Sequence, residues 1–200
     1  MANSVKPSVT SESMDCRVAV AHRSNAVRIC LIGAECTGKT TLAQALALHF
    51  GGLWVPEQLR VFCDLHSRTP RMEEQATIMR AQFEQEEQAA AQALKTGCGY
   101  VFCDSPPLLT AVYSDFYFSD PSLFDCAHAL HARYALTLVL SPDLPWQPDG
   151  FQRASEVVRA AVHSRIQQAL QAMHVPQIEV AGLHEARLQV AIEAVETLTC

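Results

Sequence analysis

The stretch GAECTGKT at residues 33–40 matches the phosphate-binding pattern G-x-x-x-x-G-K-[ST] at every fixed position. It follows a run at 27–32 that is mostly apolar and β-branched, as a buried parallel strand is, and it precedes a stretch at 41–48 that is typical of a helix. In such a unit the glycines let successive N–H groups face phosphate oxygens, and the helix directs the positive end of its dipole at them. The sequence therefore predicts a site for a nucleoside triphosphate.

The same loop predicts the roles of single residues. Lys39 should reach the terminal phosphates, and the Thr40 hydroxyl should bind the magnesium ion that accompanies them. The residues predicted to bind the nucleotide are Gly33, Glu35, Cys36, Thr37, Gly38, Lys39, Thr40 and Thr41.

Length and composition favour one domain. Two hundred residues, 49% of them hydrophobic, suffice for one substantial core, and we expect a single α/β domain at 27–200 after a loosely ordered tail at 1–26. No stretch reaches the roughly 18 apolar residues that a membrane span needs. The net charge of −6 works against non-specific binding to nucleic acid. Neither a membrane nor nucleic acid is therefore an expected partner.

The eight cysteines could in principle form disulfides or bind a metal. However, Cys30, Cys36 and Cys103 fall on predicted core strands or in the phosphate loop, where a bridge would obstruct folding or binding. No C-x-x-C pair indicates a zinc site. We expect reduced thiols and a cytoplasmic location.

Further apolar runs predict the rest of the fold. Four more strands are predicted, at 53–55, 100–104, 134–140 and 177–180. A helical stripe that starts at Thr69-Pro70 predicts a long helix ending at Gly97. Strands that alternate with helices form parallel sheets through right-handed crossovers. The predicted fold class is α/β, a three-layer sandwich with a five-stranded parallel sheet.

The strand at 100–104 ends in Asp104, the arrangement in which a carboxylate helps to hold magnesium beside the phosphate loop. We expect Asp104 and Thr40 to be the metal-binding residues. The alternative is that Asp104 caps the helix that follows Ser105-Pro106-Pro107.

The residues after Asp104 help to sort nucleotide-binding proteins. Hydrolytic ATPases usually place a glutamate there to prepare water, whereas this chain has Ser105 and Pro106. The N-K-x-D element of guanine-specific switches and the L-S-G-G-Q element of transporter ATPases are absent from the sequence. This combination favours a small-molecule kinase that uses ATP, because the acceptor hydroxyl then replaces water as the attacking group. A nucleotide-binding regulatory module without acceptor chemistry remains the alternative.

A kinase needs an acceptor for the hydroxyl proton and positive charge near the moving phosphoryl group. Glu57 follows the strand at 53–55 and could supply the first, with Arg60 on the same face of a helical turn. A surface ion pair between them is the alternative. The turn-rich segment 141–153 has the composition of a mobile lid, with Arg153 as its first candidate for charge neutralisation and Arg159 as its second.

Four parts of the chain resemble one family: the loop at 33–41, Trp54-Val55-Pro56-Glu57 with Arg60, the strand end at Asp104, and LPWQPDGFQR at 144–153. Together they are similar to the nicotinamide riboside kinase domain of NadR-type proteins, over nearly all of residues 27–196. The resemblance implies a P-loop nucleoside kinase-like fold and transfer of the ATP γ-phosphate to the 5′-hydroxyl of a ribonucleoside in NAD biosynthesis.

The sequence departs from that family on either side of the predicted acceptor pocket. Family members commonly have Glu-Tyr-Ala-Arg and Asp-Thr-Asp where this chain has residues 57–60, EQLR, and 104–106, DSP. By similarity to P-loop nucleoside kinases, Tyr113 and Asp115 lie where acceptors are contacted, whereas for Gln82 a surface position is favoured over base recognition. The predicted catalytic residues are Lys39, Glu57, Asp104 and Arg153, and those predicted to bind the acceptor are Glu57, Arg60, Tyr113 and Asp115. The predicted partners are a nucleotide and a small-molecule acceptor.

Overall fold

The computed structural model describes residues 26–146 and 155–198 of the chain. The predicted tail at 1–26 therefore lies, except for Ala26, outside the described residues, and so does Arg153.

In the described part of the chain the sheet has five strands, all parallel. In chain order they are β1 (Val27–Ile32), β2 (Leu53–Val55), β3 (Tyr100–Asp104), β4 (Leu136–Leu140) and β5 (Gln177–Val180). Their order across the sheet is β2-β3-β1-β4-β5. The predicted five-stranded parallel sheet is confirmed, and β1 lies at its centre.

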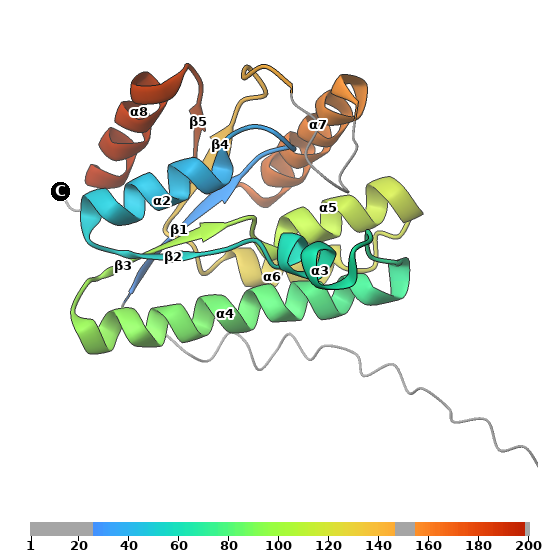
Figure 1. Ribbon diagram of the computed structural model, residues 1–200, viewed down its shortest axis with the longest axis horizontal. Helices are drawn as coiled ribbons and strands as arrows, with labels where there is room; N and C mark the ends of the chain where they lie inside the picture. Colours follow the sequence, from blue (N-terminus) through green and yellow to red (C-terminus); the bar gives the residue numbers. More distant parts are fainter. Residues whose placement is uncertain (1–25, 147–154, 199–200) are drawn as a thin grey trace, which may run out of the picture.

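Helices cover both faces of the sheet. They are α2 (Lys39–Phe50), α3 (Gln58–His66), α4 (Gln75–Thr96), α5 (Pro107–Phe118), α6 (Phe124–His131), α7 (Glu156–Met173) and α8 (His184–Glu196), with a short 3₁₀ turn η1 (Met72–Glu74) before α4. Figure 1 shows α2 and α8 on one side of the sheet and α4 on the other. The three-layer sandwich is thus confirmed as well.

Alternating side chains of β1 supply both halves of the core. Ile29 and Leu31 pack with Leu46 of α2 on one face, while Cys30 and Ile32 pack with residues of α4, α5 and α7 on the other. All four β1 side chains are fully buried, and burying each of the three aliphatic ones contributes about 1.5–3 kcal/mol. Burial on both faces explains why the strand reads in the sequence as a continuous apolar run.

The sheet order places the site. The chain leaves β1 toward the β2 and β3 side of the sheet and later returns to pair β4 on the opposite side of β1. Open parallel sheets bind ligands at such a switch point, beyond the carboxyl ends of the strands. The loops after β1, β2 and β3 meet there.

The cysteines depart in part from expectation. Cys30, Cys36 and Cys103 are not disulfide-bonded, as predicted. Cys126 on α6 is disulfide-bonded, so the prediction of reduced thiols is wrong at that position. The reasoning from buried strands could not apply to it, because Cys126 lies half-buried on a helix.

Within the described ranges, no helix combines the length and the apolar character needed to cross a membrane.

Candidate active site

The loop between β1 and α2 has a backbone that only small residues permit. Gly38 adopts φ 79°, in the left-handed region, which glycine enters without steric cost. A Cβ on Gly33 would lie 3.0 Å from the main-chain oxygen of Leu140 and 2.8 Å from Thr37 Oγ1. The glycines of the phosphate-binding pattern are therefore required here for close packing and for the turn into α2.

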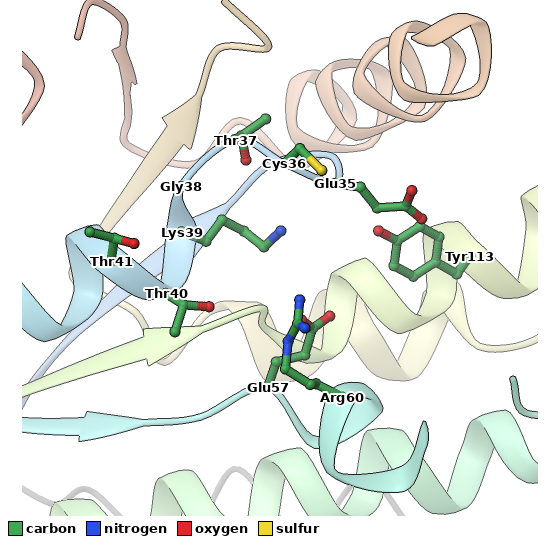
Figure 2. A pocket seen from close by; sticks show the side chains of 10 residues that line it. All are labelled: Glu35, Cys36, Thr37, Gly38, Lys39, Thr40, Thr41, Glu57, Arg60 and Tyr113. Atoms are coloured by element: carbon green, nitrogen blue, oxygen red, sulfur yellow. The ribbon is translucent and has the colours of Figure 1, made fainter. Parts of the chain in front are cut away.

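Lys39 lies across the mouth of this loop. Its Nζ donates to the main-chain oxygen of Ala34 at 3.1 Å, and Thr37 Oγ1 donates to the same oxygen at 2.8 Å. Figure 2 shows the Lys39 side chain reaching into a cavity of about 370 Å³. The cavity is lined by Glu35, Cys36, Thr37, Gly38, Lys39, Thr40, Thr41, Glu57, Arg60 and Tyr113.

The predicted metal-binding pair is in contact. Thr40 Oγ1 donates to Asp104 Oδ2 at 2.5 Å, and Asp104 is fully buried at the end of β3. Ser105 Oγ donates to the other carboxylate oxygen at 3.3 Å. A hydroxyl and a carboxylate beside a phosphate loop are ligands that suit Mg²⁺, so these two residues could hold that ion.

Glu57 lies on the wall of the cavity that is opposite the phosphate loop. It ends the segment after β2 and is the residue before α3, with 7% of its surface exposed. Burial raises the pKa of its carboxyl, while Lys39 lowers it, Asp104 raises it, and Arg60 lowers it again. Burial has the largest effect, so this carboxyl keeps a proton to higher pH than an exposed glutamate does.

Arg60 lies in the first turn of α3 and is exposed. Figure 2 shows Glu57 and Arg60 together on the side of the cavity that faces Lys39. A helical turn does begin at Gln58, and this is the condition under which both side chains were expected to share one face.

Tyr113 of α5 lies at the far end of the cavity, where Figure 2 shows its hydroxyl beside the Glu35 carboxylate. Burial raises the pKa of Tyr113 well above its ordinary value, and the charges of Glu35 and Glu57 add to this. The phenol is therefore a neutral hydrogen-bonding group. The cavity thus has a phosphate-binding end at Lys39 and a polar end formed by Glu57, Glu35 and Tyr113.

Asp115 does not line this cavity. Its carboxylate pairs with Arg165 of α7. Residues two positions apart on a helix point to nearly opposite sides, so Tyr113 and Asp115 cannot both face the site. The structure therefore brings Tyr113, but not Asp115, to the other predicted residues.

Gln82 is not on the surface, where it was expected to be. It is only 2% exposed, and it lines a second, small cavity of about 10 Å³ together with Glu57 and Tyr113. A polar residue within a helical pattern predicts a solvated face, so no local signal distinguished this glutamine from the exposed ones on α4.

Sequence reasoning also missed Arg187 of α8, which is 4% exposed. Its guanidinium reaches the phosphate loop at the main-chain oxygen of Thr37. The lid candidate Arg159 is 5% exposed and donates from Nη1 to the main-chain oxygen of Leu144 at 2.8 Å. Leu144 in turn lies close to Gly38, since a Cβ added to Gly38 would be 3.2 Å from Cδ1 of Leu144. Arg187 therefore contacts the phosphate loop itself and Arg159 a segment beside it, and neither arginine lines the cavity.

Comparisons with solved structures agree with the fold. NadR protein in complex with NAD and AMP-PNP superposes with a TM-score of 0.73 at 20% identity, covering 88% of this chain and 50% of that chain. NadR protein in complex with NR superposes with a TM-score of 0.74 at 19% identity, and the match covers 86% of this chain and 50% of that chain. Thymidylate kinase from Ehrlichia chaffeensis superposes with a TM-score of 0.61 at 14% identity, and the match covers 87% of this chain and 99% of that chain. The chain thus spans about half the length of the NadR structures.

At these identities the likeness establishes the fold, and it confirms at that level the resemblance to NadR that the sequence motifs indicated. A comparison with curated protein sequences finds no match. A family model described as an AAA domain, AAA_28, matches residues 28–187, which extend from β1 to Arg187. The chain belongs to this AAA_28 family of AAA domains.

Proposed function

We propose that this protein is a magnesium-dependent kinase that transfers the γ-phosphate of ATP to a hydroxyl of a nucleoside, with nicotinamide riboside as the first candidate. The observation that carries the proposal is the single cavity that Lys39 and the buried Glu57 share from opposite sides. A phosphate-binding loop alone would serve any nucleotide-binding protein. A buried carboxyl of raised pKa that faces the loop is what an acceptor hydroxyl needs.

Each residue then has a role. The N–H groups of residues 33–41 would hold the ATP phosphates, with the Lys39 ammonium beside the transferred group. Thr40 and Asp104 would hold Mg²⁺, whose charge, when it is bound, offsets the charge that develops on the phosphate oxygens. Glu57 would accept the proton of the attacking hydroxyl. Tyr113 and Arg60 would orient the acceptor, and Arg153 stays a prediction for closure over the transferred group.

The solved relatives support this assignment. The NadR structures contain AMP-PNP, NAD or NR, which favours a nucleoside triphosphate donor and a nicotinamide riboside acceptor. Thymidylate kinase also acts on a nucleoside-derived substrate, as its name states. The difference at residues 57–60 from the common Glu-Tyr-Ala-Arg makes a direct test of acceptors necessary.

The test measures ADP release from Mg-ATP with a panel of nucleosides, nicotinamide riboside first. We expect acceptor-dependent ADP release that falls at least ~10²-fold in Lys39→Ala. Lys95→Ala, which changes an exposed lysine at the end of α4, should leave it unchanged. Tight Mg-ATP binding without acceptor-dependent turnover would instead identify a regulatory nucleotide-binding module and reject the kinase.

A further inference from the structure

The N-terminus of α3 is capped by a residue from another helix. Helices leave their first N–H groups without partners inside the helix, and the residue before the helix usually supplies a side chain to one of them. Here that residue is Glu57, and its side chain makes no such hydrogen bond. Instead the N–H of Gln58 donates to Oε1 of Gln82 on α4, at 3.0 Å.

The orientation of Gln82 is fixed from its other side. Its Nε2 donates to Oε1 of Glu86 at 3.0 Å, one turn further along α4. A side-chain amide has one accepting oxygen and one donating nitrogen. With the nitrogen on Glu86, the oxygen must face the N–H of Gln58. Both polar atoms of Gln82 are thus occupied inside the protein.

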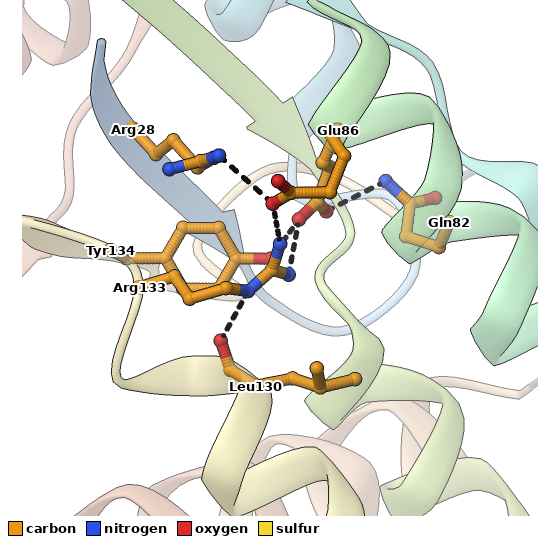
Figure 3. A network of polar contacts seen from close by, with 7 residues as sticks. Arg28, Gln82, Glu86, Leu130, Arg133 and Tyr134 are labelled. Atoms are coloured by element: carbon orange, nitrogen blue, oxygen red, sulfur yellow. Dashed lines mark hydrogen bonds and ion pairs between the residues drawn. The ribbon is translucent and has the colours of Figure 1, made fainter. Parts of the chain in front are cut away.

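Glu86 is in turn held by a buried polar network (Figure 3). Its Oε2 accepts from the Tyr134 hydroxyl at 2.6 Å and from Arg133 Nη2 at 3.0 Å. Arg133 also donates to the main-chain oxygen of Leu130 at 2.9 Å. The carboxylate is fully buried, so neither water nor a rotamer change can easily replace these partners. A continuous chain of hydrogen bonds therefore runs from Arg133 to the N–H beside Glu57.

Glu57 lines the cavity on the side that faces Lys39. Gln82 meanwhile holds the N–H of Gln58, the residue that directly follows Glu57 in the chain. We propose that Gln82, oriented by Glu86, is a positioning residue that fixes the first turn of α3 and with it Glu57 and Arg60. Its catalytic consequence rests on the proposed kinase function, whereas the positioning itself does not.

The test compares Gln82→Leu, of similar size, with Gln85→Leu, which changes an exposed glutamine on the same helix. Amide hydrogen exchange followed by NMR should show the Gln58 N–H exchanging roughly fivefold faster in Gln82→Leu, as expected for the loss of one hydrogen bond. Gln85→Leu should match the parent. The affinity for ATP should be unchanged in both variants, since neither substitution touches residues 33–41. Unchanged ATP binding also shows that the variants are folded.

A kinetic measurement separates positioning from direct recognition of the acceptor. In Gln82→Leu we expect kcat to fall about tenfold and the acidic limb of its pH profile to move to lower pH, because a loosened Glu57 becomes better hydrated. If Gln82→Leu does not bind ATP, Gln82→Ala replaces it, because it removes the same oxygen from the Gln58 N–H with a smaller side chain, and it should accelerate Gln58 exchange in the same direction.

Two results would overturn the proposal. One is Gln58 exchange that is unchanged in the ATP-binding variant. The other is altered discrimination between acceptor bases with unchanged Gln58 exchange, which would make Gln82 a recognition residue. If the parent shows no acceptor-dependent turnover, the kinase function fails, and the exchange rates alone decide whether Gln82 holds the start of α3.

Discussion

The guanidinium of Arg187 on α8 donates from Nη1 to the main-chain oxygen of Thr37 in the phosphate loop, 2.5 Å away. Its Nε donates to the Gly182 oxygen at 3.0 Å and its Nη2 to the Ser141 oxygen at 3.2 Å, and it pairs with the Asp143 carboxylate. One buried side chain thus connects the loops that follow β1, β4 and β5. The planar fork of arginine is suited to several fixed acceptors at once.

We expect Arg187→Lys to weaken ATP binding about tenfold, because one ammonium group cannot reach three separate carbonyls and the Thr37 oxygen loses its partner. Isothermal titration calorimetry with Mg-ATP measures this. Arg71→Lys is the matched control, since the Arg71 side chain is 70% exposed. Equal ATP affinity of parent and Arg187→Lys would show that the contact does not shape the loop.

The main strands could be predicted from the sequence because each pattern is local. The runs at 27–32, 53–55, 100–104 and 177–180 coincide with β1, β2, β3 and β5. β4 begins at Leu136 rather than at residue 134, because Tyr134 still belongs to the turn after α6, where its N–H donates to the His131 oxygen. Apolar periodicity does not reveal such a turn.

The candidate site could be predicted only where a motif marks it. Lys39, Thr40 and Asp104 follow from fixed spacings or strand ends, and the structure brings them together with Glu57. Gln82 and Arg187 have no such marker. Each is a buried polar residue whose partners lie at distant sequence positions, and a helical pattern assigns such residues to the solvated face.

The charge of Arg60 should set the working pH through Glu57. Arg60 lowers the pKa of the Glu57 carboxyl by favouring its ionised form. Arg60→Gln should therefore raise that pKa further and move the acidic limb of kcat/KM to higher pH, since Glu57, as the proposed base, must be deprotonated to act. High salt should shift the parent in the same direction, because Arg60 is exposed and its field is screened. A limb that does not move would assign the acidic limb to another group.

Glu57 should also limit stability. Because burial raises its pKa in the folded state, the folded chain retains this proton to higher pH than the unfolded chain does. Stability is therefore lost as the pH rises from the unfolded pKa through the folded one. Glu57→Gln avoids that loss, so we expect its Tm to exceed the parent's at pH 7 and the difference to shrink at acidic pH. Acceptor-dependent turnover should fall at least ~10²-fold.

The measurement is thermal unfolding of parent and Glu57→Gln at several pH values, with Glu84→Gln on the exposed side of α4 as the control. The control should follow the parent at each pH. A Tm of Glu57→Gln that stays below the parent's at pH 7, or a difference that does not depend on pH, would contradict the link between burial and the pKa of Glu57.

Glu86 should contribute more to folding than any exposed acidic residue on α4. Replacing Glu86 with alanine removes the carboxylate oxygen to which the Tyr134 hydroxyl donates at 2.6 Å. It also removes one of the two carboxylates that pair with Arg133. Removing one partner of a buried ion pair lowers the free energy of unfolding by about 3–5 kcal/mol. Because Arg133 keeps its ion pair with Glu87, we expect the loss in Glu86→Ala to lie near the lower end of that range. Urea unfolding should therefore show a loss of about 3 kcal/mol, against less than about 0.5 kcal/mol for Glu84→Ala. A loss as small as that of Glu84→Ala would mean that the network adds little to the stability of the fold.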